Sequence, residues 1–188
     1  MSPLHAPWAL RVAVAACTAV GWQRRAQRWV EQALAHQPDN TYALATLAHW
    51  RSEAGDFEAA QSLLQRCVAH EPAQASHWFN LGFVSERLGQ LAEAERAFRR
   101  ATELSPVLDR AWYGLGLVLI ALDRLGEAVA ALERVTLLQP MSPHGWYQLA
   151  RVRCDLGQPE AALGIIARLR QFEPKVADQL VRETALVA

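Results

Sequence analysis

Apolar residues recur along the chain at spacings of three and four, which places their side chains on one face of a helix. The clearest stretch has two such stripes, formed by Trp78, Leu81, Ser85 and Leu88 and then by Leu91, Ala94, Phe98 and Ala101. Gly89 and Gln90 lie between the stripes, and a glycine can end a helix by adopting a positive φ. The pattern therefore predicts two antiparallel helices joined by a tight turn.

This two-stripe pattern returns every 34 residues, and a proline marks each return. The prolines are Pro38, Pro72, Pro106, Pro140 and Pro174, and an alanine recurs in the same register at Ala26, Ala60, Ala94, Ala128 and Ala162. A fixed period of this length indicates a repeat array. We expect repeats at about 7–40, 41–74, 75–108, 109–142 and 143–176.

The residue types within each repeat suit a stack of helix pairs. Small residues such as Gly82 and Ala94 let two helices approach closely, and the proline ends the second helix because its ring and missing N–H interrupt the hydrogen-bond ladder. One pair cannot bury its own apolar face, so neighbouring repeats must stack. Trp78, Trp112 and Trp146 share one repeat position, and we expect them to form a regular buried ladder.

The third copy carries nearly a whole family signature: Trp78, Leu81, Gly82, Ala94, Phe98, Ala101 and Pro106. This pattern resembles the tetratricopeptide repeat (TPR) family. The resemblance implies an all-α, right-handed α-solenoid of five tandem helix-turn-helix repeats. We expect a single domain over residues 1–188, closed by a C-terminal capping helix over 177–188, in which Leu180, Val181 and Val187 lean to one side.

Composition narrows the classes of partner. The chain has 19 basic and 19 acidic residues, so its formal net charge of zero gives no electrostatic reason to bind nucleic acid or an acidic membrane. Lys175 is its only lysine, and arginine and alanine are abundant, which is typical of a GC-rich coding sequence. We therefore expect a bacterial source.

The sequence contains no recognised catalytic or metal-binding motif. Cys17, Cys67 and Cys154 have no metal-ligand spacing, the six histidines are scattered, and phosphate loops and nucleophile elbows are absent. We expect no enzyme activity, no metal and no cofactor.

The apolar segment from Trp8 to Val20 could be a targeting signal, and Val14-Ala15-Ala16-Cys17 loosely resembles a lipoprotein cleavage site. However, the segment is shorter than a membrane span and lies in repeat register, so cleavage would destroy the first helix. We expect a cytoplasmic protein without membrane insertion.

The resemblance also implies where a partner binds, because members of this family hold peptides or helices in the concave groove lined by their first helices. The groove residues implied here are Tyr42, His49, Phe79, Asn80, Phe83, Arg110, Tyr113, Leu117, His144, Tyr147 and Arg151. Aromatic residues with arginines nearby are typical interface anchors. They suit a segment with hydrophobic side chains and an acidic group or C-terminal carboxylate.

One known variant of the groove does not fit. Chaperone-binding members of the family use a carboxylate clamp, of whose five positions only Asn80 and Arg110 match here. We do not expect binding of chaperone tails.

Three functions remain open at this stage. The leading hypothesis is a non-catalytic scaffold or adaptor that binds a protein or peptide segment. The alternatives are a substrate-presenting domain of a larger enzyme, such as a transferase or hydroxylase, and a self-associating assembly protein. The last alternative, a homo-oligomer, is motivated by Trp8, Trp22 and Trp29, which cluster in the first repeat.

Overall fold

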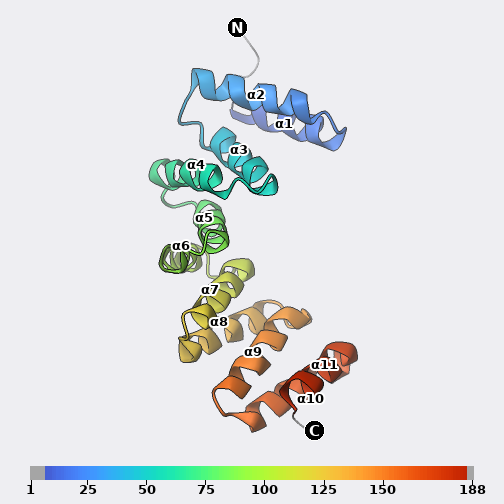
Figure 1. Cartoon of the computed structure of the whole chain (residues 1–188). Helices are drawn as coiled ribbons and strands as arrows, with labels where there is room; N and C mark the ends of the chain where they lie inside the picture. The colour runs from blue at the N-terminus through green and yellow to red at the C-terminus, as the bar shows by residue number, and fades with distance from the viewer. Residues whose placement is uncertain (1–6, 186–188) are drawn as a thin grey trace. The chain divides into compact units, whose positions relative to one another are not determined.

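The computed structural model describes residues 7–185, and within this range the chain forms eleven helices and no strand (Figure 1). They are α1 (Pro7–Ala19), α2 (Gln23–His36), α3 (Thr41–Glu53), α4 (Phe57–His70), α5 (Ala75–Arg87), α6 (Leu91–Leu104), α7 (Asp109–Ala121), α8 (Leu125–Leu138), α9 (Pro143–Asp155), α10 (Pro159–Phe172) and α11 (Pro174–Thr184). Each repeat thus has a first helix of 13 residues and a second of 14. The helical repeat pattern predicted from the sequence is confirmed.

The turn inside each repeat depends on one left-handed residue. Gly21, Gly55, Gly89 and Gly157 have φ values of 74°, 80°, 72° and 69°. In the fourth repeat Asp123 occupies the same place with φ 58°. Aspartate is among the few non-glycine residues that enter this region routinely, so the turn keeps its shape there.

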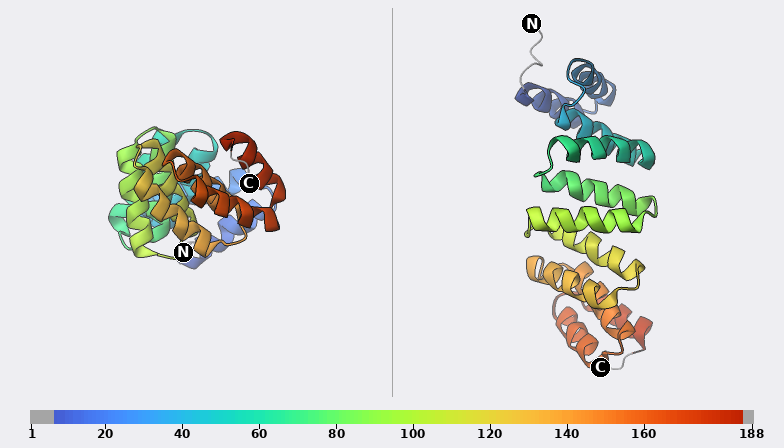
Figure 2. Two further views of the ribbon diagram at one scale, coloured as in Figure 1. Left: turned by 90° about the horizontal axis from the view of Figure 1, so that it is seen from below. Right: turned by 90° about the vertical axis from the view of Figure 1, so that its left-hand side faces the viewer.

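The chain divides into two compact units, Met1–Leu88 and Gly89–Ala188, and the boundary falls in the turn of the third repeat. The first unit contains α1–α5 and the second contains α6–α11. Within each unit, consecutive helices pack side by side (Figure 2). The expectation of a single domain over 1–188 stays a prediction.

Small residues set the close approach of helices in both units. Ala60, Ala94, Ala128 and Ala162 are fully buried. Gly116 on α7 shows why bulk is excluded, because a Cβ there would lie 2.9 Å from Cδ2 of Leu132 on α8. In each pair, large side chains of one helix therefore pack against the backbone of the other, at positions where a small residue leaves room for them.

The three repeated tryptophans do not form a buried ladder, and that expectation is wrong. Each is half-buried, and each donates its indole N–H to a proline carbonyl oxygen six residues earlier. The bonds join Trp78 to Pro72, Trp112 to Pro106 and Trp146 to Pro140, at 2.8, 3.0 and 3.0 Å. The indole N–H needs an acceptor, and here the acceptor lies in the exposed turn between repeats. The tryptophan and the proline thus form one structural link.

The last helix begins three residues before the expected start at 177. Only Glu173 separates α10 from α11, and Pro174 occupies the first turn of α11, where a missing N–H costs nothing. Ala177 and Leu180 are fully buried against the last repeat. Val187, which we expected on the same face, lies outside the described residues.

A network of four charged side chains links α6 to the start of α8. Arg99 contacts Glu95 and Glu127 at 2.8 and 2.7 Å, and Arg124 contacts the same two carboxylates at 2.7 Å each. Burial raises the pKa of Glu95, but hydrogen bonds from both arginines outweigh it and lower that pKa overall. The hydrogen bond from Arg124, followed by that from Arg99, lowers the pKa of Glu127.

This network predicts a loss of stability in acid. A carboxylate with a lowered folded pKa stabilises the fold above its unfolded pKa, and this contribution disappears as the pH falls through the folded pKa. We expect Arg124→Gln to lower the melting temperature at neutral pH. The variant and the wild type should melt alike once the pH has fallen below the lowered folded pKa values of Glu95 and Glu127, because both carboxylates are then protonated. Circular dichroism melts across this pH range measure the difference.

Arg96→Gln is the matched control. It also removes one arginine charge, but from an exposed side chain on α6 whose pair with Glu93 is 3.8 Å long. Its effect should be small at every pH. A destabilisation by Arg124→Gln that does not change with pH would contradict the assignment of the network.

Candidate protein-interaction surface

In the first unit, the predicted interaction residues lie on α3 and α5. Tyr42, Phe79 and Asn80 are half-buried, whereas His49 is exposed and Phe83 is 41% exposed. These side chains lie in the register that the repeat predicts.

Two of these residues have neighbours on the same unit. Arg11 of α1 lies over the Tyr42 ring, with its guanidinium carbon 5.1 Å from the ring centroid. Nε2 of His49 lies 3.5 Å from Oε1 of Glu53, and both side chains are largely exposed. This part of the surface thus carries aromatic, basic and acidic side chains.

In the second unit, the predicted residues lie on α7 and α9. Arg110, His144 and Arg151 are exposed, and Tyr113, Leu117 and Tyr147 are half-buried. The structure brings Tyr147 and Arg151 together, with the guanidinium carbon 5.8 Å from the ring centroid.

Each of the two tyrosines of this unit has one side packed against the core and the other exposed at the surface. Tyr113 packs against a cluster that includes Val129 and Leu132, and Tyr147 packs against a cluster that includes Ile166 and Leu180. Their remaining surface is open to solvent. They therefore present a rigid aromatic surface, because the buried side of each ring is held by the core.

The C-terminal helix adds residues to this surface. The Tyr147 hydroxyl donates to Glu183 of α11 at 2.5 Å, and Gln179 donates to the same carboxylate at 2.8 Å. The hydrogen bond to Glu183 raises the pKa of Tyr147, and the bonds from Tyr147 and Gln179 lower the pKa of Glu183. The 34-residue period would not have found Glu183, because it places this residue at the position of the buried Leu149. Only the packing of α11 brings its carboxylate to Tyr147.

A hollow of about 540 Å³ adjoins the tyrosine. It is lined by Tyr147, Arg151, Cys154, Asp155, Glu183 and Thr184. The lining combines one aromatic ring, one guanidinium and two carboxylates, so it offers contacts to both the apolar and the charged groups of a peptide.

The described residues offer little for reactive or metal chemistry. Within residues 7–185 no group of three histidine, cysteine or acidic side chains could hold a metal ion. Burial, followed by the nearby Glu71, raises the pKa of the Cys67 thiol to about 11, which keeps it protonated and unreactive. No helix in the described part of the chain is long and apolar enough to cross a membrane.

Comparison with solved structures finds the same fold in several TPR proteins. MamA from Desulfovibrio magneticus RS-1 is 17% identical with a TM-score of 0.79, and the match covers 90% of this chain and 96% of that one. YrrB, a TPR protein with an unusual peptide-binding site, is 19% identical with a TM-score of 0.78, covering 90% and 88%. TTC0263, a thermophilic TPR protein from Thermus thermophilus, is 23% identical with a TM-score of 0.64, covering 96% and 97%.

Sequence comparison gives the family directly. No curated protein matches the sequence. The family model described as the Cilia and flagella-associated protein 70 middle TPR-like domain matches residues 44–172. This match covers more than half of the chain and agrees with the repeat register, the helix pairs and the structural neighbours. The chain belongs to the tetratricopeptide repeat family.

Proposed function

We propose that this protein is a non-catalytic interaction scaffold that binds a segment of a partner protein on the face formed by the first helices of its repeats. Two findings support the proposal. The TPR fold occurs in YrrB, which has a peptide-binding site. The residues that the family resemblance implies for such a face are open to solvent or half-open in both units.

The observation that carries the proposal is the surface of α7 and α9. Tyr113 and Tyr147 stand at the same repeat position on these two helices, half-buried and fixed by the core beneath them. Arg110 and Arg151 are exposed on the same helices. Rigid aromatic rings lose little rotamer entropy on binding, and arginine supplies a fork of donors.

These groups define the chemistry of the partner. Aromatic rings favour a segment with apolar side chains, and two exposed guanidinium groups favour a carboxylate on that segment. We therefore propose a peptide that combines hydrophobic residues with an acidic side chain or a C-terminal carboxylate.

A selection from displayed peptides tests this proposal on the full chain. Enriched peptides are synthesised, and their affinities are measured by fluorescence anisotropy. We expect the double variant Arg110→Ala/Arg151→Ala to bind them about tenfold more weakly, since charge-assisted hydrogen bonds to a carboxylate are lost. Both arginines are exposed, so the melting temperature should change little.

Arg134→Ala/Arg168→Ala is the matched control. These two arginines lie over Trp112 and Trp146 from the second helices α8 and α10, at 5.8 and 4.7 Å from the ring centroids. Binding should stay within about twofold of the wild type. Equal weakening by both double variants would show that the face of the first helices is not the binding surface.

A further inference from the structure

The junction between one repeat and the next is filled with apolar side chains in the second unit. Between α8 and α9, Val129, Leu149 and Val152 form a buried cluster, and Leu125 packs against it. Val152 has an exposed fraction of 1%, which shows how completely the junction is closed.

The junction between α2 and α3 differs at three of the four equivalent positions. Residues 102 positions earlier are Gln23 in place of Leu125, Gln27 in place of Val129, Leu47 in place of Leu149 and Trp50 in place of Val152. Trp50 is also the exception among its own equivalents, because Val84, Val118 and Val152 are each only 1% exposed. A large ring therefore stands where the fold normally accepts a valine.

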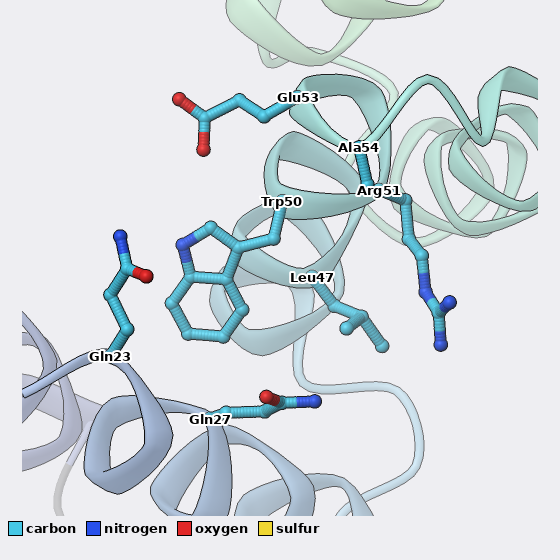
Figure 3. A pocket seen from close by; sticks show the side chains of 7 residues that line it. All are labelled: Gln23, Gln27, Leu47, Trp50, Arg51, Glu53 and Ala54. Carbon is cyan, nitrogen blue, oxygen red and sulfur yellow. The ribbon is translucent and has the colours of Figure 1, made fainter.

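This junction contains a hollow of about 390 Å³, lined by Gln23, Gln27, Leu47, Trp50, Arg51, Glu53 and Ala54. Figure 3 shows the nitrogen edge of Trp50 turned toward Gln23, with Gln27 on the α2 side of the ring and Glu53 beyond it on α3. The hollow thus has an aromatic wall and a polar rim. None of the eleven predicted interaction residues lines it.

The polar groups of the rim are available to a ligand. Among the described residues, the structure gives no hydrogen-bond partner to the side chains of Gln23 and Gln27 or to the indole of Trp50. The equivalent of Gln27 in the next repeat, Gln61, instead donates to Ser85 at 3.2 Å. The Gln27 amide therefore lacks the partner that the next repeat supplies to Gln61.

The rim carries two charged side chains, Arg51 and Glu53, and only Glu53 is available to pair with a cation. Arg51 is paired with Asp56 at 3.3 Å and extends on the far side of Leu47 from the indole (Figure 3). Glu53 contacts His49, but only at 3.5 Å and with most of its side chain exposed. A cation that enters beside Trp50 would therefore meet a carboxylate that has no arginine or lysine partner in the described structure.

We infer that this hollow binds an arginine side chain of a partner polypeptide, stacked on the indole of Trp50 and paired with Glu53. A planar guanidinium matches the flat indole wall, and its donors suit the Glu53 carboxylate and the amide oxygens of Gln23 and Gln27. Its alkyl stem can lie along Leu47. A lysine ammonium would pair with Glu53 but could not stack flat on the ring.

The inference is tested by NMR on the full chain, using the indole N–H resonance of Trp50, which Trp50→Phe identifies. The probe is N-acetyl-arginine methylamide, in which the charges of the free amino acid are blocked. We expect a saturable shift with a dissociation constant on the order of 1 mM. Glu53→Gln should weaken binding about fivefold, whereas Glu58→Gln, an exposed carboxylate on α4, should leave it unchanged.

Two further probes decide the chemistry. The citrulline analogue has the shape of arginine without its charge and should bind at least about fivefold more weakly, and the lysine analogue should also bind more weakly. Absence of a saturable shift, or equal binding of the citrulline or lysine analogue, would overturn the inference. If free arginine binds much more tightly than the blocked probe, the ligand is not an arginine within a polypeptide, and that part of the inference is overturned.

The site is separable from the face on α7 and α9. Arg110→Ala/Arg151→Ala should keep the response of Trp50 to the probe, because both arginines belong to the other unit and neither lines the hollow. The Trp50 response is therefore independent of whether that face binds a partner.

Discussion

Phe98→Ala is expected to reduce the free energy of unfolding by about 3–5 kcal/mol. Phe98 on α6 is only 2% exposed. Its ring reaches the backbone of Gly114 on α7, which has no side chain that could move into the space left behind. The substitution should therefore leave a cavity that the surroundings cannot refill. Urea unfolding followed by circular dichroism at the helix band measures the change.

Phe83→Ala provides the matched control for this prediction. Phe83 also lies on a helix of the third repeat but is 41% exposed, so truncation removes much less buried surface. Its cost should be about 1–2 kcal/mol, well below that of Phe98→Ala. If both substitutions cost the same, Phe98 does not occupy the buried position between α6 and α7.

The helices of this fold were predictable because residues that end a helix recur at the same position of successive repeats. Gly21, Gly55, Gly89 and Gly157 each occupy the one turn position that requires a positive φ, and the period of 34 residues carries this assignment even to Asp123. The tryptophan ladder was not predictable from the same pattern. Periodicity reports which face of a helix is apolar, but it does not show that an indole N–H must reach a carbonyl oxygen in an exposed turn.

The candidate interaction face was predictable only in part. Repeat register places Tyr147 and Arg151 on one helix face, and the structure brings them together. The contact from Tyr147 to Glu183 depends on how α11 packs, which the pattern leaves open. Side-chain volume does not predict the hollow beside Trp50, because two glutamines and a tryptophan are larger than the leucine and two valines at the equivalent positions. Only the packing shows that space remains there.

Gly114→Ala is expected to lower the free energy of unfolding by about 2 kcal/mol, although alanine is the better helix former by about 1 kcal/mol. A Cβ at Gly114 would lie 2.6 Å from Cζ, 2.7 Å from Cε1 and 2.9 Å from Cε2 of Phe98. Three ring atoms of a buried side chain cannot all retreat, so the overlap must separate α6 from α7 or distort the Phe98 rotamer. Urea unfolding of the variant measures the net effect.

Gly164→Ala separates the steric cost from helix propensity. Gly164 lies within α10, and a Cβ there would meet nothing within 4 Å, so this variant should gain about 0.5–1 kcal/mol. In the double variant Gly114→Ala/Phe98→Leu, the smaller leucine side chain should restore part of the stability lost in Gly114→Ala, because the two changes act on the same contact. If Gly114→Ala instead raises the free energy of unfolding as much as Gly164→Ala does, α6 and α7 do not approach as closely as this contact requires.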